Sequence, residues 1–120
     1  MFFGGNFKGT IADNIINGSG VGVEFAGKRL PTNGRLDANF DNNTIINVET
    51  GINMLHPRVE CLNITSCNVN ASGYAIYADE PFGTYVGYIG VYNSTFVGDI
   101  SGIFEDAVGT NYGNNTGFPS

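Results

Sequence analysis

Two acidic pairs in the second half of the chain have the chemistry to bind hydroxyl groups or a hard cation. Asp79 stands next to Glu80, and Glu105 stands next to Asp106. Carboxylate oxygens accept hydrogen bonds from sugar hydroxyls, and they are also the ligands that Ca²⁺ prefers. We therefore predict a ligand-binding site at these four residues, with Asp79 and Asp106 as the ligands if Ca²⁺ is bound. The alternative is a solvated loop edge where the carboxylates rotate apart.

Tyrosines in the same half of the chain are the second group of candidate binding residues. Most of them flank residues that we expect to point inward, so their rings should point outward. Exposed aromatic rings stack on sugar faces or pack into subunit interfaces, although packing beneath the loop "EPFGTYVG" would also account for them. The tyrosines predicted to bind a ligand are Tyr74, Tyr77, Tyr88 and Tyr92.

The composition argues against polyanionic partners. The chain has 120 residues, with eleven Asp and Glu against five Lys and Arg, which gives a net charge of −6. Nucleic acids and anionic membranes attract basic surfaces, so we predict no nucleic-acid partner and no membrane partner. The two cysteines are too few for a disulfide framework, and no Cys or His spacing indicates zinc.

A repeat predicts how these residues are positioned. Four stretches align on one apolar anchor each, and apolar residues recur five residues before and seven residues after the anchor. The anchors are Ile16, Ile45, Val69 and Phe96; the residues before them are Ile11, Phe40, Ile64 and Val91; the residues after them are Val23, Ile52, Ile76 and Ile103. The extra length between units falls in loops, and this combination is typical of a stacked coil.

A column of short polar residues accompanies the apolar ones. Asn and Asp tolerate left-handed backbone geometry, and short polar side chains bond to neighbouring backbone groups. We therefore predict a structural ladder at a bend, formed by Asp13, Asn42, Ser66 and Asn93. The next column, Asn14, Asn43, Cys67 and Ser94, is nearly as polar.

The same register brings the acidic pairs together. Asp79 and Asp106 each stand ten residues after an anchor, so stacked coils would hold their side chains about 5 Å apart. Like charges at that distance raise each other's pKa unless a cation or hydrogen-bond donors intervene. Ca²⁺ is therefore the one cofactor that the sequence suggests.

These features predict an all-β fold, a right-handed single-stranded parallel β-helix of about four coils with variable loops on one side. The β-helix domain spans residues 1–106, and a Gly- and Asn-rich tail spans residues 107–120. A β-sandwich also has short strands and turns, but it would not keep the same offsets through four consecutive units. Over about Phe7 to Asp106 the chain resembles the pectin-lyase-like superfamily, in its coil length, its apolar inner ladder and its Asn-rich turn.

The resemblance implies two classes of function. Members of the superfamily include polysaccharide lyases, polygalacturonases, phage tailspikes and non-catalytic adhesins. The polygalacturonase-like motifs are missing, since "NNTII" lacks the expected Asp and His56 has no glycine neighbours. We predict no catalytic residue and a non-catalytic carbohydrate-facing or structural module of a tailspike-like or adhesin-like protein. The alternative is a carbohydrate-active enzyme of the polysaccharide lyase or glycoside hydrolase type, or a fragment of one.

Partners and location follow from the same resemblance. A stack of four coils is only about 20 Å tall, and its end coils leave apolar columns and strand edges unpaired. We therefore expect a homo-oligomer, with a trimer as the first expectation by analogy with viral members of the fold. The expected ligand is a polysaccharide or other glycan, and the expected location is extracellular or on a virion surface.

Overall fold

The computed structural model describes residues 1–27 and 34–119, and within these ranges the chain forms ten β-strands and one short α-helix. Their bounds are β1 Phe2–Gly4, β2 Phe7–Ala12, β3 Ile15–Ala26, β4 Leu36–Asp41, β5 Thr44–Leu55, β6 Arg58–Thr65, β7 Asn68–Ala78, β8 Tyr85–Tyr92, β9 Thr95–Ile100, α1 Gly102–Val108 and β10 Tyr112–Gly113. The described helix is too short and too polar to cross a membrane.

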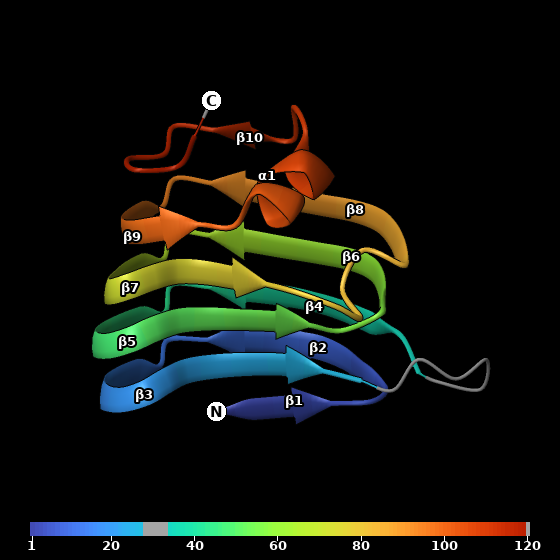
Figure 1. Cartoon of the computed structure of the whole chain (residues 1–120), viewed down its shortest axis with the longest axis horizontal. Coiled ribbons are helices and arrows are strands. Elements are labelled where there is room, and N and C mark those ends of the chain that lie inside the picture. The colour runs from blue at the N-terminus through green and yellow to red at the C-terminus, as the bar shows by residue number, and fades with distance from the viewer. Residues whose placement is uncertain (28–33, 120) are drawn as a thin grey trace.

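The strands form two parallel sheets that face each other. One sheet has the order β1-β3-β5-β7-β9 and the other has the order β10-β8-β6-β4-β2. Figure 1 shows the chain running leftward through the rear sheet and rightward through the front sheet while it rises, which makes the coil right-handed. The chain completes three full turns and a shortened fourth, so the predicted all-β parallel β-helix is confirmed.

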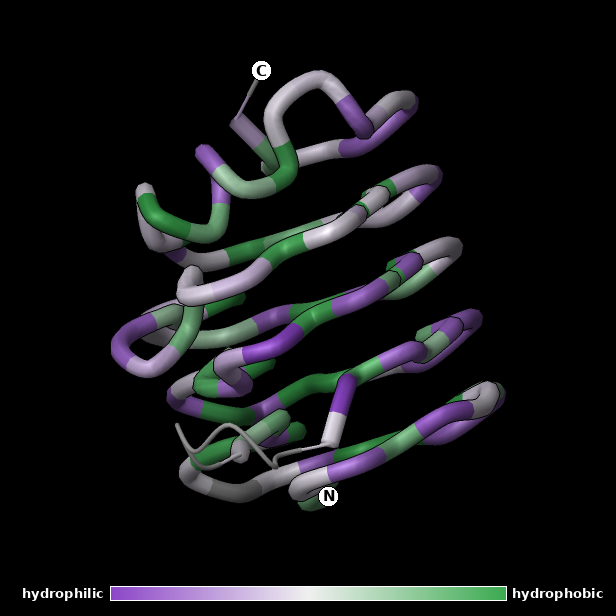
Figure 2. The backbone as a smooth tube through the Cα atoms, turned by 90° about the vertical axis from the view of Figure 1, so that its right-hand side faces the viewer, coloured by the Kyte–Doolittle hydropathy of each residue, from purple (hydrophilic) through white to green (hydrophobic). Residues whose placement is uncertain are grey.

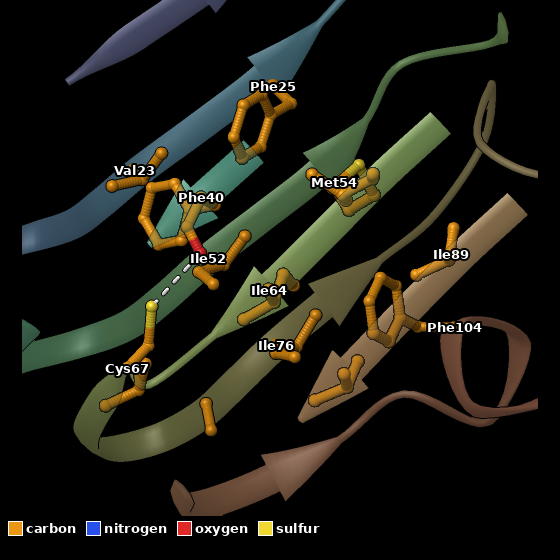
Figure 3. Close-up of a cluster of buried hydrophobic side chains, with 14 of the residues drawn as sticks. Val23, Phe25, Phe40, Ile52, Met54, Ile64, Cys67, Ile76, Ile89 and Phe104 are labelled. Atoms are coloured by element: carbon orange, nitrogen blue, oxygen red, sulfur yellow. Dashed lines mark hydrogen bonds between the residues drawn. The ribbon is translucent and has the colours of Figure 1, made fainter. Parts of the chain in front are cut away.

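Like residues stack in columns because successive coils pair in register. Ile16 pairs with Ile45, Ile45 with Val69, and Val69 with Phe96. The column of Ile11, Phe40, Ile64 and Val91 forms in the same way on the opposite sheet. Figure 2 shows hydrophobic and hydrophilic residues alternating along the strands, and Figure 3 shows apolar side chains from both sheets meeting in one core. Each fully buried aliphatic side chain contributes about 1.5–3 kcal/mol.

The third predicted column ends one coil early. Val23, Ile52 and Ile76 pair as expected, but Ile76 then pairs with Ile100. The prediction that Ile103 points inward is wrong, because Ile103 lies on α1 and is 47% exposed. The last coil turns its corner with fewer residues, and the register shifts on both sides of Tyr74.

Helix α1 takes over where the fourth coil leaves the sheet. The backbone N–H of Ser101 donates to Ile76 O at 3.0 Å, and Ser101 Oγ accepts from the N–H of Ala78 at 3.0 Å. These two bonds give hydrogen-bond partners to two backbone groups, Ile76 O and Ala78 N–H, on the upper edge of β7. Phe104 and Val108 are fully buried, so the helix covers the core with its apolar side.

The bend after each strand of the rear sheet uses left-handed backbone geometry. The residues with positive φ are Asp13 (61°), Asn42 (53°), Ser66 (53°), Asn93 (54°) and Asn114 (58°). Left-handed geometry costs most residues about 1–2 kcal/mol, and Asn and Asp lower that cost by bonding locally. Asn42 Nδ2 also donates to Asp13 Oδ1 at 2.8 Å, which joins two neighbouring corners.

Inward-facing polar side chains beside this bend join one coil to the next. Asn43 Oδ1 accepts from the N–H of Asn14 at 3.0 Å, and Asn43 Nδ2 donates to Ile11 O at 2.9 Å. Three coils higher, Asn115 makes the same two bonds, from Ser94 N–H and to Val91 O, both at 2.9 Å. Each of these side chains therefore satisfies buried backbone groups of the coil before it.

Residues after Asp106 continue the stack. Tyr112 and Gly113 pair with β8, and Thr116 bridges to Thr95. The ring of Phe118 packs against Phe96, with 5.8 Å between ring centroids. The segment that the sequence sets apart as a tail thus supplies part of a fifth coil.

The column of anchors gives a direct stability test. Val69 is fully buried, whereas its neighbour Asn68 is exposed. We expect Val69→Asp to prevent folding, at a cost of at least about 4 kcal/mol, because it buries an unpaired charge. Asn68→Asp should change the free energy of unfolding by less than about 0.5 kcal/mol. Chemical denaturation of both variants checks the register, and equal stability would contradict it.

The inward polar residues give a second test. We expect Asn43→Ala to lower the free energy of unfolding by about 2 kcal/mol, because it leaves the N–H of Asn14 without its acceptor and removes one bond to the carbonyl of Ile11. Asn39→Ala is the matched control, since Asn39 lies on the same coil, is exposed and accepts one side-chain bond from Asn63. The control should cost less than about 1 kcal/mol in the same urea titration.

Candidate functional site

An open depression lies between the β7–β8 connection and helix α1. Its volume is about 680 Å³. The lining residues are Asp79, Glu80, Phe82, Gly83, Val86, Ile103, Asp106 and Ala107. Three of the four predicted acidic residues therefore meet at one place.

The β7–β8 connection is held in shape by its own hydrogen bonds. Asp79 Oδ1 accepts from the N–H of Glu80 at 2.8 Å, and Asp79 O accepts from the N–H of Phe82 at 2.9 Å. Thr84 Oγ1 donates to Pro81 O at 2.9 Å. The buried ring of Phe82 packs against Phe104 of α1, with 5.9 Å between centroids. The loop and the helix are thus joined beneath the depression.

The acidic residues meet by a different route from the predicted one. Asp106 lies on α1, because the fourth coil leaves the sheet after Ile100, so the predicted column of Asp79 above Asp106 does not form. The helix turns Phe104 inward and leaves Asp106 exposed at the rim. Glu105, also predicted, is not among the lining residues.

A pair of tyrosines extends from the front sheet to the rim. Tyr77 Oη donates to Asp79 Oδ2 at 3.0 Å, and the rings of Tyr74 and Tyr77 meet edge to face at 5.1 Å. The hydrogen bond to Asp79 and the negative charge of that carboxylate raise the pKa of Tyr77, because both disfavour the phenolate. Tyr77 therefore stays protonated and holds the Asp79 carboxylate in place.

The other two predicted tyrosines lie on the opposite sheet. Tyr88 and Tyr92 belong to β8, and their hydroxyl oxygens are 3.3 Å apart. Their rings lie over Gly90, where an added Cβ would stand 2.7 Å from Tyr88 Oη and 2.8 Å from Tyr92 Cε2. The hydrogen bond to Tyr92 raises the pKa of Tyr88. The four predicted tyrosines are thus divided between two faces of the molecule.

The structure offers little for the predicted Ca²⁺. Within residues 1–27 and 34–119, no group of three or more His, Cys, Asp or Glu side chains is placed to hold a metal ion. Asp79 and Asp106 would supply two ligands, whereas Ca²⁺ takes six to eight oxygens. The carboxylates are better suited to accepting hydrogen bonds.

His56 and Cys67 serve the core. His56 is 1% exposed, and its Nδ1 accepts from the N–H of Arg58 at 3.1 Å, so Nε2 carries the proton and donates to Gly5 O at 2.6 Å. Burial raises the pKa of the Cys67 thiol, and Cys67 Sγ donates to Phe40 O at 3.4 Å.

The apolar lining of the depression was not predicted from the sequence. Phe82, Val86 and Ala107 lie between the acidic residues. Phe82 and Val86 belong to "EPFGTYVG". Large apolar residues in a stretch that Pro and Gly mark as a loop were the signal that could have found them.

Comparison with known proteins gives no relative: no protein-family model, no curated protein and no solved structure matches the chain. The structure supports a parallel β-solenoid, and the finer resemblance to pectin-lyase-like proteins rests on the coil pattern alone.

The contact between Tyr77 and Asp79 gives a pH test. Because the pKa of Tyr77 is raised above its ordinary value of about 10, the bond stabilises the fold fully below that pH. This contribution is lost as the pH rises through the raised pKa. We expect Asp79→Asn to lower the pKa of Tyr77, as followed by ¹³C-tyrosine NMR. Asp99→Asn, which changes an exposed carboxylate outside the depression, should leave it unchanged.

Proposed function

We propose that the chain is a non-catalytic carbohydrate-binding module on a rigid β-solenoid, of the kind carried by tailspike-like or adhesin-like surface proteins. The observation that carries the proposal is the depression, whose lining combines the carboxylates of Asp79, Glu80 and Asp106 with apolar side chains. Binding sites for small molecules combine apolar lining with a few convergent polar groups.

The chemistry of the depression matches that of a sugar ring. A sugar presents hydroxyl groups around its edge and C–H groups on its faces. The carboxylates accept hydrogen bonds from hydroxyls, and such charge-assisted bonds are stronger than neutral ones. Phe82 and Val86 offer apolar contact to the C–H groups, and the exposed ring of Tyr74 lies beyond Tyr77 for stacking.

The charge of the depression favours one class of glycan. Its lining residues include three carboxylates and neither Lys nor Arg. A uronate or sulfated sugar would be repelled by these charges, so the proposed ligand is a neutral or amino-bearing glycan. In this proposal the module stands outside the cell or on a virion surface, where such glycans are met.

Glycan-array binding tests the proposal. We expect the wild type to bind neutral or amino-bearing glycans, and the double variant Asp79→Asn, Asp106→Asn to bind at least tenfold more weakly. Glu49→Gln is the control, because it removes one exposed negative charge on β5, outside the depression. Circular dichroism should show that all three proteins are folded.

Two results would contradict the proposal. Absence of glycan binding by the folded wild type would remove the carbohydrate function. New reducing ends or unsaturated products on incubation with bound polysaccharides would replace the non-catalytic module by an enzyme, which is the alternative that the coil pattern also allows.

A further inference from the structure

The two ends of the solenoid are covered to different degrees. At the C-terminal end, the column residues Val91 and Phe96 are 0% and 3% exposed. At the N-terminal end, Ile11, in the column of Val91, is 5% exposed, but Phe7 and Ile16 are partly exposed, although Leu36 and Ile45, which pair with them one coil higher, are fully buried. The core is therefore covered less completely at the N-terminal end than at the C-terminal end.

The C-terminal end carries a cover that the N-terminal end lacks. Helix α1, β10 and the residues up to Phe118 occupy the level above the fourth coil (Figure 1). Phe118 packs on both Phe96 and Tyr112. Head-to-tail stacking of copies would bring the strand β1 of one copy against this cover.

Two strand edges are bare at the N-terminal end. In the described part of the chain, β1 is the last strand of one sheet and β2 is the last strand of the other. The N–H groups of Phe7 and Asp13 donate upward, to Arg35 O and Asp41 O. Because the backbone alternates along a strand, the N–H groups of Lys8, Thr10 and Ala12 point away from β4, toward the open end.

We propose that a second copy of this chain docks on the N-terminal end, with β1 of each copy pairing antiparallel to β2 of the other. Strands β1 and β2 lie on opposite sheets at the same end and run in opposite directions (Figure 1). A twofold axis parallel to the strands exchanges the two sheets, so it sets each β1 beneath the partner's β2. Such an interface is isologous and closes on itself.

A second copy covers this end better than a single foreign strand does. One added strand would pair with one bare edge, whereas the twofold arrangement pairs both edges of both copies. The solenoid measures at most 35 by 23 Å across its axis, and a face of that size approaches the roughly 800 Å² per partner of a stable interface. Lys8 is the one charged side chain on β1 and β2, so little charge opposes close approach.

Exposed apolar residues at this end point to the same partner. Phe2 of β1 is 66% exposed and Met1 is 47% exposed. Bare edges and apolar side chains together are the features that drive strand pairing between chains.

Sedimentation velocity of the 120-residue chain tests the interface. We expect a dimer at tens of micromolar. Thr10→Pro should shift the chain to monomer, because it removes an N–H that faces the partner while leaving the β2–β4 bonds, and proline is tolerated on strand edges. Thr10→Val is the matched control, since it keeps the N–H and should remain dimeric. A wild-type monomer or trimer, or a dimeric, folded Thr10→Pro variant, would overturn the proposal.

Hydrogen exchange on the wild type keeps the test decisive if Thr10→Pro does not fold. The amide of Thr10, near the middle of β2, should exchange slowly in the dimer and at least tenfold faster after dilution to monomer. The amide of Phe7, bonded within the chain, should not change with concentration. Fast exchange of the Thr10 amide in the dimer would overturn the proposal.

Discussion

The stack depends on the hydrogen bonds between each inward-facing polar side chain and the backbone of the coil before it. At the corner, the chain turns away from the sheet ladder, so the N–H group that follows the left-handed residue has a side-chain acceptor in place of a strand partner. Asn43 and Asn115 each satisfy one donor and one acceptor there. Ser94 Oγ, with less reach, accepts from the N–H of Cys67 at 3.1 Å. Without these bonds the N–H groups of Asn14, Cys67 and Ser94 would lose the acceptors that the side chains supply.

The corner also explains why the fold could be predicted from the sequence. A left-handed residue, an inward polar residue and an apolar anchor must recur in that order in every coil, so their spacing is visible as a repeat. The loops between units do not disturb it, because the strands on both sides restore the register. The columns through Ile45 and Ile64 therefore follow from spacing alone.

The candidate site could not be predicted in the same way, because it forms where the repeat ends. Ile103 has the right residue type and spacing for the core, but the chain leaves the sheet after Ile100, so Ile103 lies on helix α1 instead of in the column. Phe104, one residue later, takes the buried place. The helix then carries Asp106 to the rim of the depression. The prediction that Asp106 lies near Asp79 assumed that both residues lie on stacked strands, and that assumption is wrong.

The corner has a consequence for protein modification. It favours Asn for left-handed geometry, although Asp13 and Ser66 also adopt it. A short polar residue that faces inward comes next, followed by a residue on the outer face, where a β-branched Thr fits the pleated surface. The triplets Asn42-Asn43-Thr44, Asn93-Ser94-Thr95 and Asn114-Asn115-Thr116 meet these needs, and each also spells the acceptor signal for N-linked glycosylation. The packing of the coil alone accounts for these three of the six signals in the chain, whereas the other three, at Asn17, Asn63 and Asn70, lie within strands.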